Sequence, residues 1–310
     1  MTFSARVKNE IISKGLSTMQ EKSAFLSGFI RATSSIIQKD GEYGFEFSVE
    51  SYATAEYVLY LMRSVFDYEP KDEPIVSQRI TVECVGDGAV ELLEKLSIIT
   101  DGEQGFSLNV SLDGYKTDKQ RKAFIKGVFL GSGNVTVPKK HEGEKNVSTG
   151  YHLEFVFFGY EQALEFTSFL AETDVFTKLI ARKDNYVIYI KSSEEIKDFL
   201  ALIGAPKCAL ELTEIMLEKE ITASANRRAN CDIANVTKQA DASYKMISAI
   251  DEIERTVGLE SLPIALKETA LARREFPEDT LQELADRLSI TKSCLNHRLR
   301  KLTEIEKNLR

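Results

Sequence analysis

The stretch KSAFLSGFIRATSSI at residues 22–36 has a close copy, RKAFIKGVFLGSGNV, at residues 121–135. In both, Ala and Phe are followed by an aliphatic residue, and a glycine two positions later precedes two apolar residues, so that Gly28 and Gly127 hold equivalent places 99 positions apart. Units of solenoid proteins are only about 20–50 residues long. The spacing therefore indicates a duplicated half-domain.

Glycine inside a helix needs a reason, because it costs about 1 kcal/mol relative to alanine. Its recurrence in both copies favours two equivalent helices whose backbones pack closely across a pseudo-two-fold axis. The alternative is a tolerated glycine in each of two ordinary buried helices.

The segments after each copy repeat as well, as period-2 and period-3.6 patterns predict. After the first copy we expect the strand GFEFSVES, the helix AEYVLYLMRSVF, the strand QRITVECV and the helix DGAVELLEKLSII. After the second we expect the strand YHLEFVFF, the helix EQALEFTSFLAE, a hairpin of FTKLIAR and NYVIYIK turning at Asp184–Asn185, and the helix SEEIKDFLALIG capped by Ser192 or Ser193. Each half is thus helix, strands, helix, strands, helix.

The segments LSGFIRATS and IKGVFLGSG resemble the paired LAGLIDADG helices of homing endonucleases. The resemblance implies an α+β fold with pseudo-two-fold symmetry over residues 1–205, in two repeats of about 1–100 and 101–205. In such enzymes the penultimate acid of each motif binds a divalent metal. Here those positions are Thr33 and Ser132, which lack the negative charge that a hard cation prefers. We expect no catalytic residue and no metal site.

The last third is predicted to be helical. Residues 206–255 are predicted to form two connecting helices, the second capped by Asn230 or Asp232, and residues 256–310 an all-α domain with helices at 262–273, 279–288 and 292 to about 305. The apolar spacing around Ala285, where only a small side chain fits between crossing helices, is typical of a helix-turn-helix. Ser289 stands in the turn where glycine is common.

Charge is distributed unevenly along the chain, whose net charge is -8. Residues 1–220 hold 25 basic and 34 acidic residues, whereas residues 221–310 hold 15 and 14. The segment TKSCLNHRLRK at 291–301 has no acid, and its side chains are of types that contact phosphates and base edges. The expected DNA-binding residues are Lys292, Ser293, Asn296, His297, Arg298, Arg300 and Lys301, with Arg227, Arg228 and Lys238 as secondary candidates. The alternative is three packed helices with a solvated basic face.

A second resemblance covers nearly the whole chain. Four segments look, in this order, like segments of the WhiA family: FSARVKNEI, NRRANCDIANVTK, LPIALKETALAR and KSCLNHRLRKL. The resemblance implies a sequence-specific, non-enzymatic transcriptional regulator of cell division or sporulation, whose partners are double-stranded DNA at promoters and other regulatory proteins. Two alternatives stay open: a metal-dependent endonuclease or nickase, and a DNA-tethered protein-interaction platform.

Other site classes find little support in the sequence. The four cysteines lie far apart without histidines at ligand spacing, which predicts neither disulfides nor zinc. No segment approaches the roughly 18 apolar residues of a membrane span, and the first residues lack a signal peptide's apolar core. We expect a cytoplasmic, nucleoid-associated protein without a cofactor or membrane contact.

Overall fold

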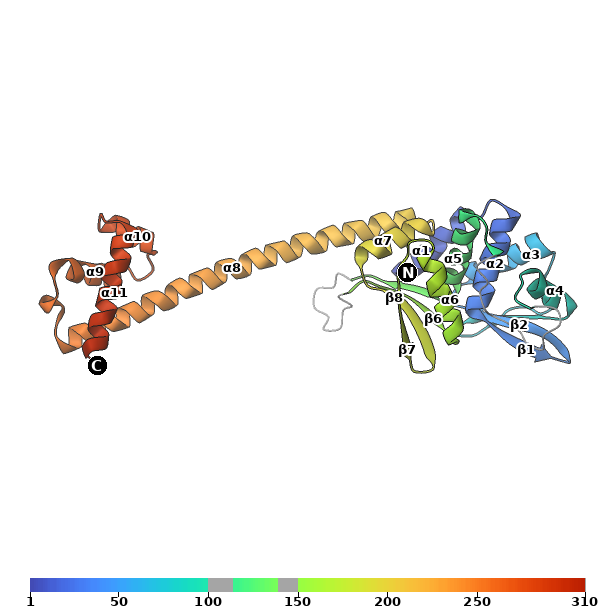
Figure 1. The fold of residues 1–310 in the computed structure, drawn as a ribbon, viewed down its shortest axis with the longest axis horizontal. Helices are drawn as coiled ribbons and strands as arrows, with labels where there is room; N and C mark the ends of the chain where they lie inside the picture. The colour runs from blue at the N-terminus through green and yellow to red at the C-terminus, as the bar shows by residue number, and fades with distance from the viewer. Residues whose placement is uncertain (100–113, 139–149, 310) are drawn as a thin grey trace. The chain divides into compact units, whose positions relative to one another are not determined.

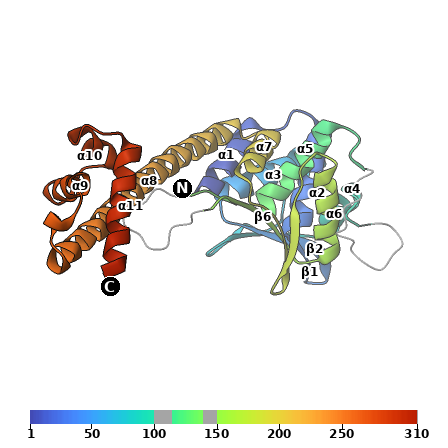
Figure 2. The same cartoon turned by 60° about the vertical axis from the view of Figure 1, so that its left-hand side comes forward.

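A computed structural model describes residues 1–99, 114–138 and 150–309 (Figure 1). The chain forms two compact units, Met1–Glu218 and Lys219–Arg310. The boundary between these units falls inside one long helix, α8 (Pro206–Thr256), which Figure 2 also shows as a continuous ribbon.

The first unit contains the same succession of elements twice. The first half consists of α2 (Met19–Thr33), β1 (Ser34–Lys39), β2 (Glu42–Val49), α3 (Tyr52–Phe66), β3 (Ile75–Val76), β4 (Ile80–Val85) and α4 (Asp87–Lys95), preceded by α1 (Phe3–Lys14). The second consists of α5 (Asp118–Ser132), β5 (Gly133–Thr136), β6 (His152–Phe157), α6 (Tyr160–Ala171), β7 (Lys178–Arg182), β8 (Asn185–Ile190) and α7 (Ser193–Leu202). The antiparallel sheets have equivalent strand orders, β1-β2-β4-β3 and β5-β6-β8-β7. The predicted duplication is confirmed.

Helices α2 and α5 pack with their backbones in direct contact. A Cβ atom added at Gly28 would lie 2.3 Å from the carbonyl oxygen of Phe124, and one added at Gly127 would lie 2.0 Å from that of Phe25. Both phenylalanine side chains are fully buried. The two glycines therefore allow the close approach that their repetition predicted.

Each central helix is joined to the sheet of its own half by an aromatic pair. Phe29 of α2 meets Phe47 of β2 edge to face with ring centroids 5.2 Å apart, and Phe129 of α5 meets Phe155 of β6 at 6.1 Å. Edge-to-face rings add about 0.5–1.5 kcal/mol beyond the area they bury. The helix pair thus lies at the centre of one continuous core.

Two predictions about local structure were wrong. The β7–β8 turn consists of Lys183 and Asp184, with Lys183 at φ 55°, so Asn185 already pairs with Arg182 as the first residue of β8. Residues 206–255 belong to one continuous helix, α8, in which Asn230 lies on the exposed surface instead of capping a second helix. Asn and Asp favour caps only where the chain already breaks, and residues 207–257 contain neither glycine nor proline.

Helix α1 is tied to the start of α8 by a buried carboxylate. Glu10 accepts hydrogen bonds from the backbone N–H groups of Lys207 at 2.9 Å and Cys208 at 3.0 Å, and Arg6 forms an ion pair with Glu211 nearby. The first N–H groups of a helix lack partners within the helix and carry partial positive charge. Burial, the largest single influence, would raise the pKa of Glu10, but the two backbone donors, the Cys208 thiol and the charge of Lys14 together lower the pKa.

We predict that Gly28→Ala destabilises the first unit by about 1–3 kcal/mol or more, because the added methyl group overpacks the helix contact. Gly114→Ala is the matched control, since a Cβ there meets nothing within 4 Å. Urea unfolding followed by circular dichroism measures both. Equal midpoints for the two variants would contradict the close-packing interpretation.

We predict that Glu10→Ala costs about 1.5–3 kcal/mol at neutral pH, because two buried donors lose a charged partner. The pKa of this carboxyl is lower in the folded protein, so its contribution is present above the unfolded-state pKa and disappears as pH falls through the folded-state pKa. Unfolding free energies measured between neutral and acidic pH should therefore converge for the wild type and the variant. A difference that persists in strong acid is the contrary result.

Candidate nucleic-acid interface

The second unit holds a small core, which we call the three-helix core, in which three helices pack against the end of α8. Helices α9 (Ile264–Glu275), α10 (Leu281–Arg287) and α11 (Lys292–Leu309) follow the end of α8 and a short 3₁₀ turn, η2 (Leu259–Ser261). The core consists of Ile250, Ile253, Leu259, Ala270, Leu284, Ala285, Leu295, Leu299 and Leu302. Ala285 is completely buried, in agreement with the small-residue position predicted from the sequence.

The turn between α10 and α11 has left-handed backbone geometry at Ser289, with φ 52°. This region favours glycine, and serine adopts it here with the turn closed by two hydrogen bonds. The N–H of Ser289 donates to Asp286 O at 3.1 Å, and that of Ile290 to Ala285 O at 3.0 Å. The predicted helix-turn-helix is therefore present despite the unusual turn residue.

Helix α10 begins at Leu281, two residues after the predicted start at residue 279. Thr280 is the N-cap: its hydroxyl accepts from the N–H of Glu283, whose carboxylate accepts from the N–H of Thr280. Asp279 instead pairs with Arg287, and its carbonyl accepts from the buried Arg273 at 2.8 Å. These contacts fix the loop that precedes α10.

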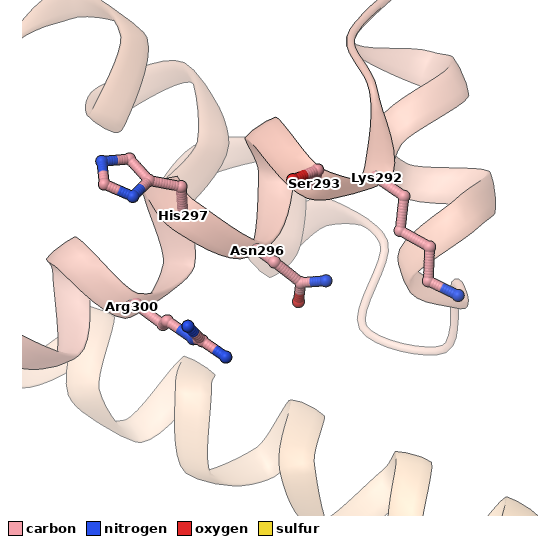
Figure 3. A pocket seen from close by; sticks show the side chains of 5 residues that line it. All are labelled: Lys292, Ser293, Asn296, His297 and Arg300. Carbon is pink, nitrogen blue, oxygen red and sulfur yellow. The ribbon is translucent and has the colours of Figure 1, made fainter.

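One face of α11 gathers five of the predicted DNA-binding residues. A surface pocket is lined by Lys292, Ser293, Asn296, His297 and Arg300 (Figure 3). They share a face because residues three and four apart in a helix lie above one another. Asn296 is half-buried and the other four are exposed. Two permanent cations, an imidazole, an amide and a hydroxyl are thus presented together, without a carboxylate among them.

Lys301 is exposed but does not line this pocket. Its ammonium pairs with Glu304 at 2.9 Å, and this hydrogen bond lowers the pKa of the Glu304 carboxyl. The charge of Lys301 is therefore shared with an acid of its own helix.

Arg298 lies on a different side of α11, contrary to its grouping with the other six. Its guanidinium donates to Ala265 O at 3.2 Å and to Thr269 Oγ1 at 3.4 Å, and Thr269 is completely buried. Two positions correspond to about 200° of rotation around a helix, so Arg298 faces away from Asn296 and Arg300. The sequence identifies Arg298 as a cation, but only the packing of the helices shows that it joins α11 to α9.

The secondary candidates Arg227, Arg228 and Lys238 lie on α8, all exposed and outside the pocket. The structure does not bring them together with the five residues of α11 in one pocket.

The positions of the missing LAGLIDADG acids lie at the ends of α2 and α5. The hydroxyl of Thr33 donates to Phe29 O at 2.7 Å, and that of Ser132 to Val128 O at 3.2 Å. A Cβ added at Gly131 would lie 2.4 Å from Thr33 Cγ2, so the two helix ends lie close together. Within the described ranges, no three His, Cys, Asp or Glu side chains form a group that could hold a metal ion.

Both halves of this architecture match family models. Residues 22–81 and 121–222 match the WhiA LAGLIDADG-like domain, and residues 225–306 match the WhiA C-terminal HTH domain. The chain belongs to the WhiA family. This confirms the second resemblance, and the α+β fold class is that of a LAGLIDADG-like domain followed by a helix-turn-helix domain.

Relatives of this WhiA protein match over its whole length. The "Probable cell division protein WhiA" of Thermoanaerobacter sp. (strain X514) is 34% identical over 100% of this chain and 98% of its own. The protein of the same name from Clostridium botulinum (strain Hall / ATCC 3502 / NCTC 13319 / Type A) is 32% identical over 100% of this chain and 99% of its own. The crystal structure of full-length DUF199/WhiA from Thermatoga maritima matches with a TM-score of 0.57 and 26% identity, covering 99% of both chains. Among the helices of the described ranges, none has the length and apolar character to span a membrane.

We predict that Arg298→Ala loosens the three-helix core, because two acceptors on α9 lose their donor at a cost of about 1–3 kcal/mol. Hydrogen exchange of the full chain measures this as faster exchange in α9 and α11. Arg300→Ala is the control, because Arg300 is exposed on the pocket face. The structural role of Arg298 is refuted if both variants exchange like the wild type.

Proposed function

We propose that this WhiA protein is a sequence-specific, non-enzymatic DNA-binding transcription regulator that acts at promoters. The observation that carries the proposal is the acid-free pocket face of α11, on the second helix of a helix-turn-helix. In this motif the second helix enters the major groove and its N-terminal residues contact base edges. Lys292, Ser293, Asn296 and His297 all lie within the first two turns of α11.

The residue types allow separate roles to be assigned. Asn296 is suited to bidentate pairing with adenine, and Arg300 to pairing with guanine or a phosphate. Lys292 provides a point charge for a phosphate, while Ser293 and His297 add shorter-range hydrogen bonds. Arg298 has no DNA-contacting role in this proposal, because its guanidinium already donates hydrogen bonds to α9. Lys301 adds a positive charge outside the pocket.

The biological setting follows from the relatives, which are named cell division proteins. We propose that this chain regulates genes of cell division or sporulation, in the cytoplasm at the nucleoid, and that other regulatory proteins are further partners. The LAGLIDADG-like domain has a non-enzymatic role in this proposal, because Thr33 and Ser132 offer neutral hydroxyls that donate to their own helices.

Two substitutions in the full chain separate base reading from phosphate contact. Asn296→Ala should cost roughly 1–3 kcal/mol on a duplex selected from a random library, and spare a scrambled duplex. Lys292→Ala should weaken binding to both duplexes alike and reduce the slope of log K against log salt by about 1.

Fluorescence anisotropy titrations at several salt concentrations measure both effects, with Lys245→Ala on α8 as a cation control outside the pocket. If Asn296→Ala, Ser293→Ala and Arg300→Ala each kept the full preference for the selected duplex over the scrambled one, α11 would not be the helix that reads the bases. Failure of the full chain to enrich any sequence would refute sequence-specific binding itself.

A further inference from the structure

The part of α8 that belongs to the second unit has an unusually bare surface. From residue 219 to residue 242 every residue is exposed except the half-buried Ala223. The segment nevertheless falls largely within the stretch that matches the family's helix-turn-helix domain, which begins at residue 225. Because this segment of α8 covers no hydrophobic core, core packing does not explain which residues it carries.

One side of α8 is fixed by its packing at the C-terminal end. Ile250 and Ile253 belong to the three-helix core, and Met246 packs against it. Met246 also marks where α11 crosses α8, since its sulfur lies 4.0 Å from the hydroxyl of Thr303. This side of α8 therefore faces α11.

Toward the N-terminus of α8, the same side of the helix carries polar residues in place of apolar ones. Steps of seven, four and seven positions keep to one side of a helix, and from Met246 they lead back to Gln239, Asn235 and Arg228. All three are exposed. We call Arg228, Asn235 and Gln239 the α8 stripe. At 1.5 Å per residue, it extends to about 27 Å from Met246.

The pocket face of α11 is turned toward α8. Figure 3 shows the side chains of Lys292, Asn296 and Arg300 pointing from α11 to the side on which the α8 ribbon runs. A duplex seated on that face would extend along the side of the unit that carries the α8 stripe.

We infer that the α8 stripe is a second contact surface for the duplex that α11 reads. Arg228 supplies an ion pair to a phosphate, and the amides of Asn235 and Gln239 donate hydrogen bonds to phosphate or sugar oxygens. The Asn235 amide donates a long hydrogen bond of 3.7 Å to Cys231 Sγ, which a phosphate or sugar oxygen can replace. The inference rests on the proposed function, and it adds backbone contacts on one flank of the site read by α11.

The chain contains its own controls, because equal charges lie on different sides of α8. Arg227 is one position, or about 100°, from Arg228, and Lys238 is equally displaced from Gln239. Asp232 is not part of the α8 stripe, but it lies four positions from Arg228 on the same side of the helix, where its charge opposes phosphate. Asp241 lies on another side.

The experiment uses the full chain with a duplex selected by that chain and a scrambled duplex. Arg228→Ala should lower the salt slope by about 1 and remove hydroxyl-radical protection on one flank of the site, whereas Arg227→Ala should leave both unchanged. Asp232→Asn should tighten binding, and Asp241→Asn should not. Circular dichroism and urea unfolding check that the helix is retained in each variant.

The proposed DNA contact of the α8 stripe is refuted if Arg227→Ala and Arg228→Ala have equal effects, because equal effects indicate diffuse charge attraction. It is also refuted if neither variant changes the salt slope or the footprint. Either outcome differs from failure of the proposed function. In that case Asn296→Ala and Arg300→Ala would also leave binding and discrimination unchanged.

Discussion

The first unit depends on the backbone contact between α2 and α5. A helix pair this close leaves no room for a Cβ at Gly28 or Gly127, because the opposing carbonyl oxygens lie only 2.3 and 2.0 Å from where these atoms would be. Once the two helices are paired, Phe29 and Phe129 each pack against the sheet of their own half and complete one core shared by both halves. The duplicated half-domains are thus stable together, because each supplies the surface that the other buries.

The same helix pair keeps the packing of a LAGLIDADG-like fold with neutral side chains at the helix ends. Metal chemistry in this fold requires acids at the converging helix ends, and here those ends hold hydroxyls that bond to their own helix turns. Neutral side chains at these positions avoid placing two like charges where the helix ends lie close together. The packing and the chemistry of a LAGLIDADG helix are therefore separable, because they use different residues of the same motif.

The second unit shows why net charge is a poor guide to DNA binding. The chain carries a net charge of -8, yet the pocket face of α11 presents Lys292, His297 and Arg300 without an acid among the lining residues. At physiological ionic strength, charges more than about 8 Å apart are largely screened. The charges of the side chains that line the pocket therefore matter more for a bound phosphate than the net charge summed over the chain. Arg298 and Arg273 use their charges differently, since their hydrogen bonds position the helices that carry the pocket.

The sequence by itself determined the duplication, the two glycines, most of the helices and strands of each half, and the basic face of α11. These features follow from local period, residue size and charge, which are readable one segment at a time. The sequence did not predict α1 or the strands β1, β3 and β5. Tertiary structure alone decided that residues 206–256 form one helix, that Thr280 caps α10, and that Arg298 bonds α9 while Arg300 stays exposed. It also decided that Arg228, and not Arg227, lies on the side of α8 whose C-terminal end packs against α11. A side chain's type sets which partners it can take, but the partner it has depends on which distant segment packs beside it.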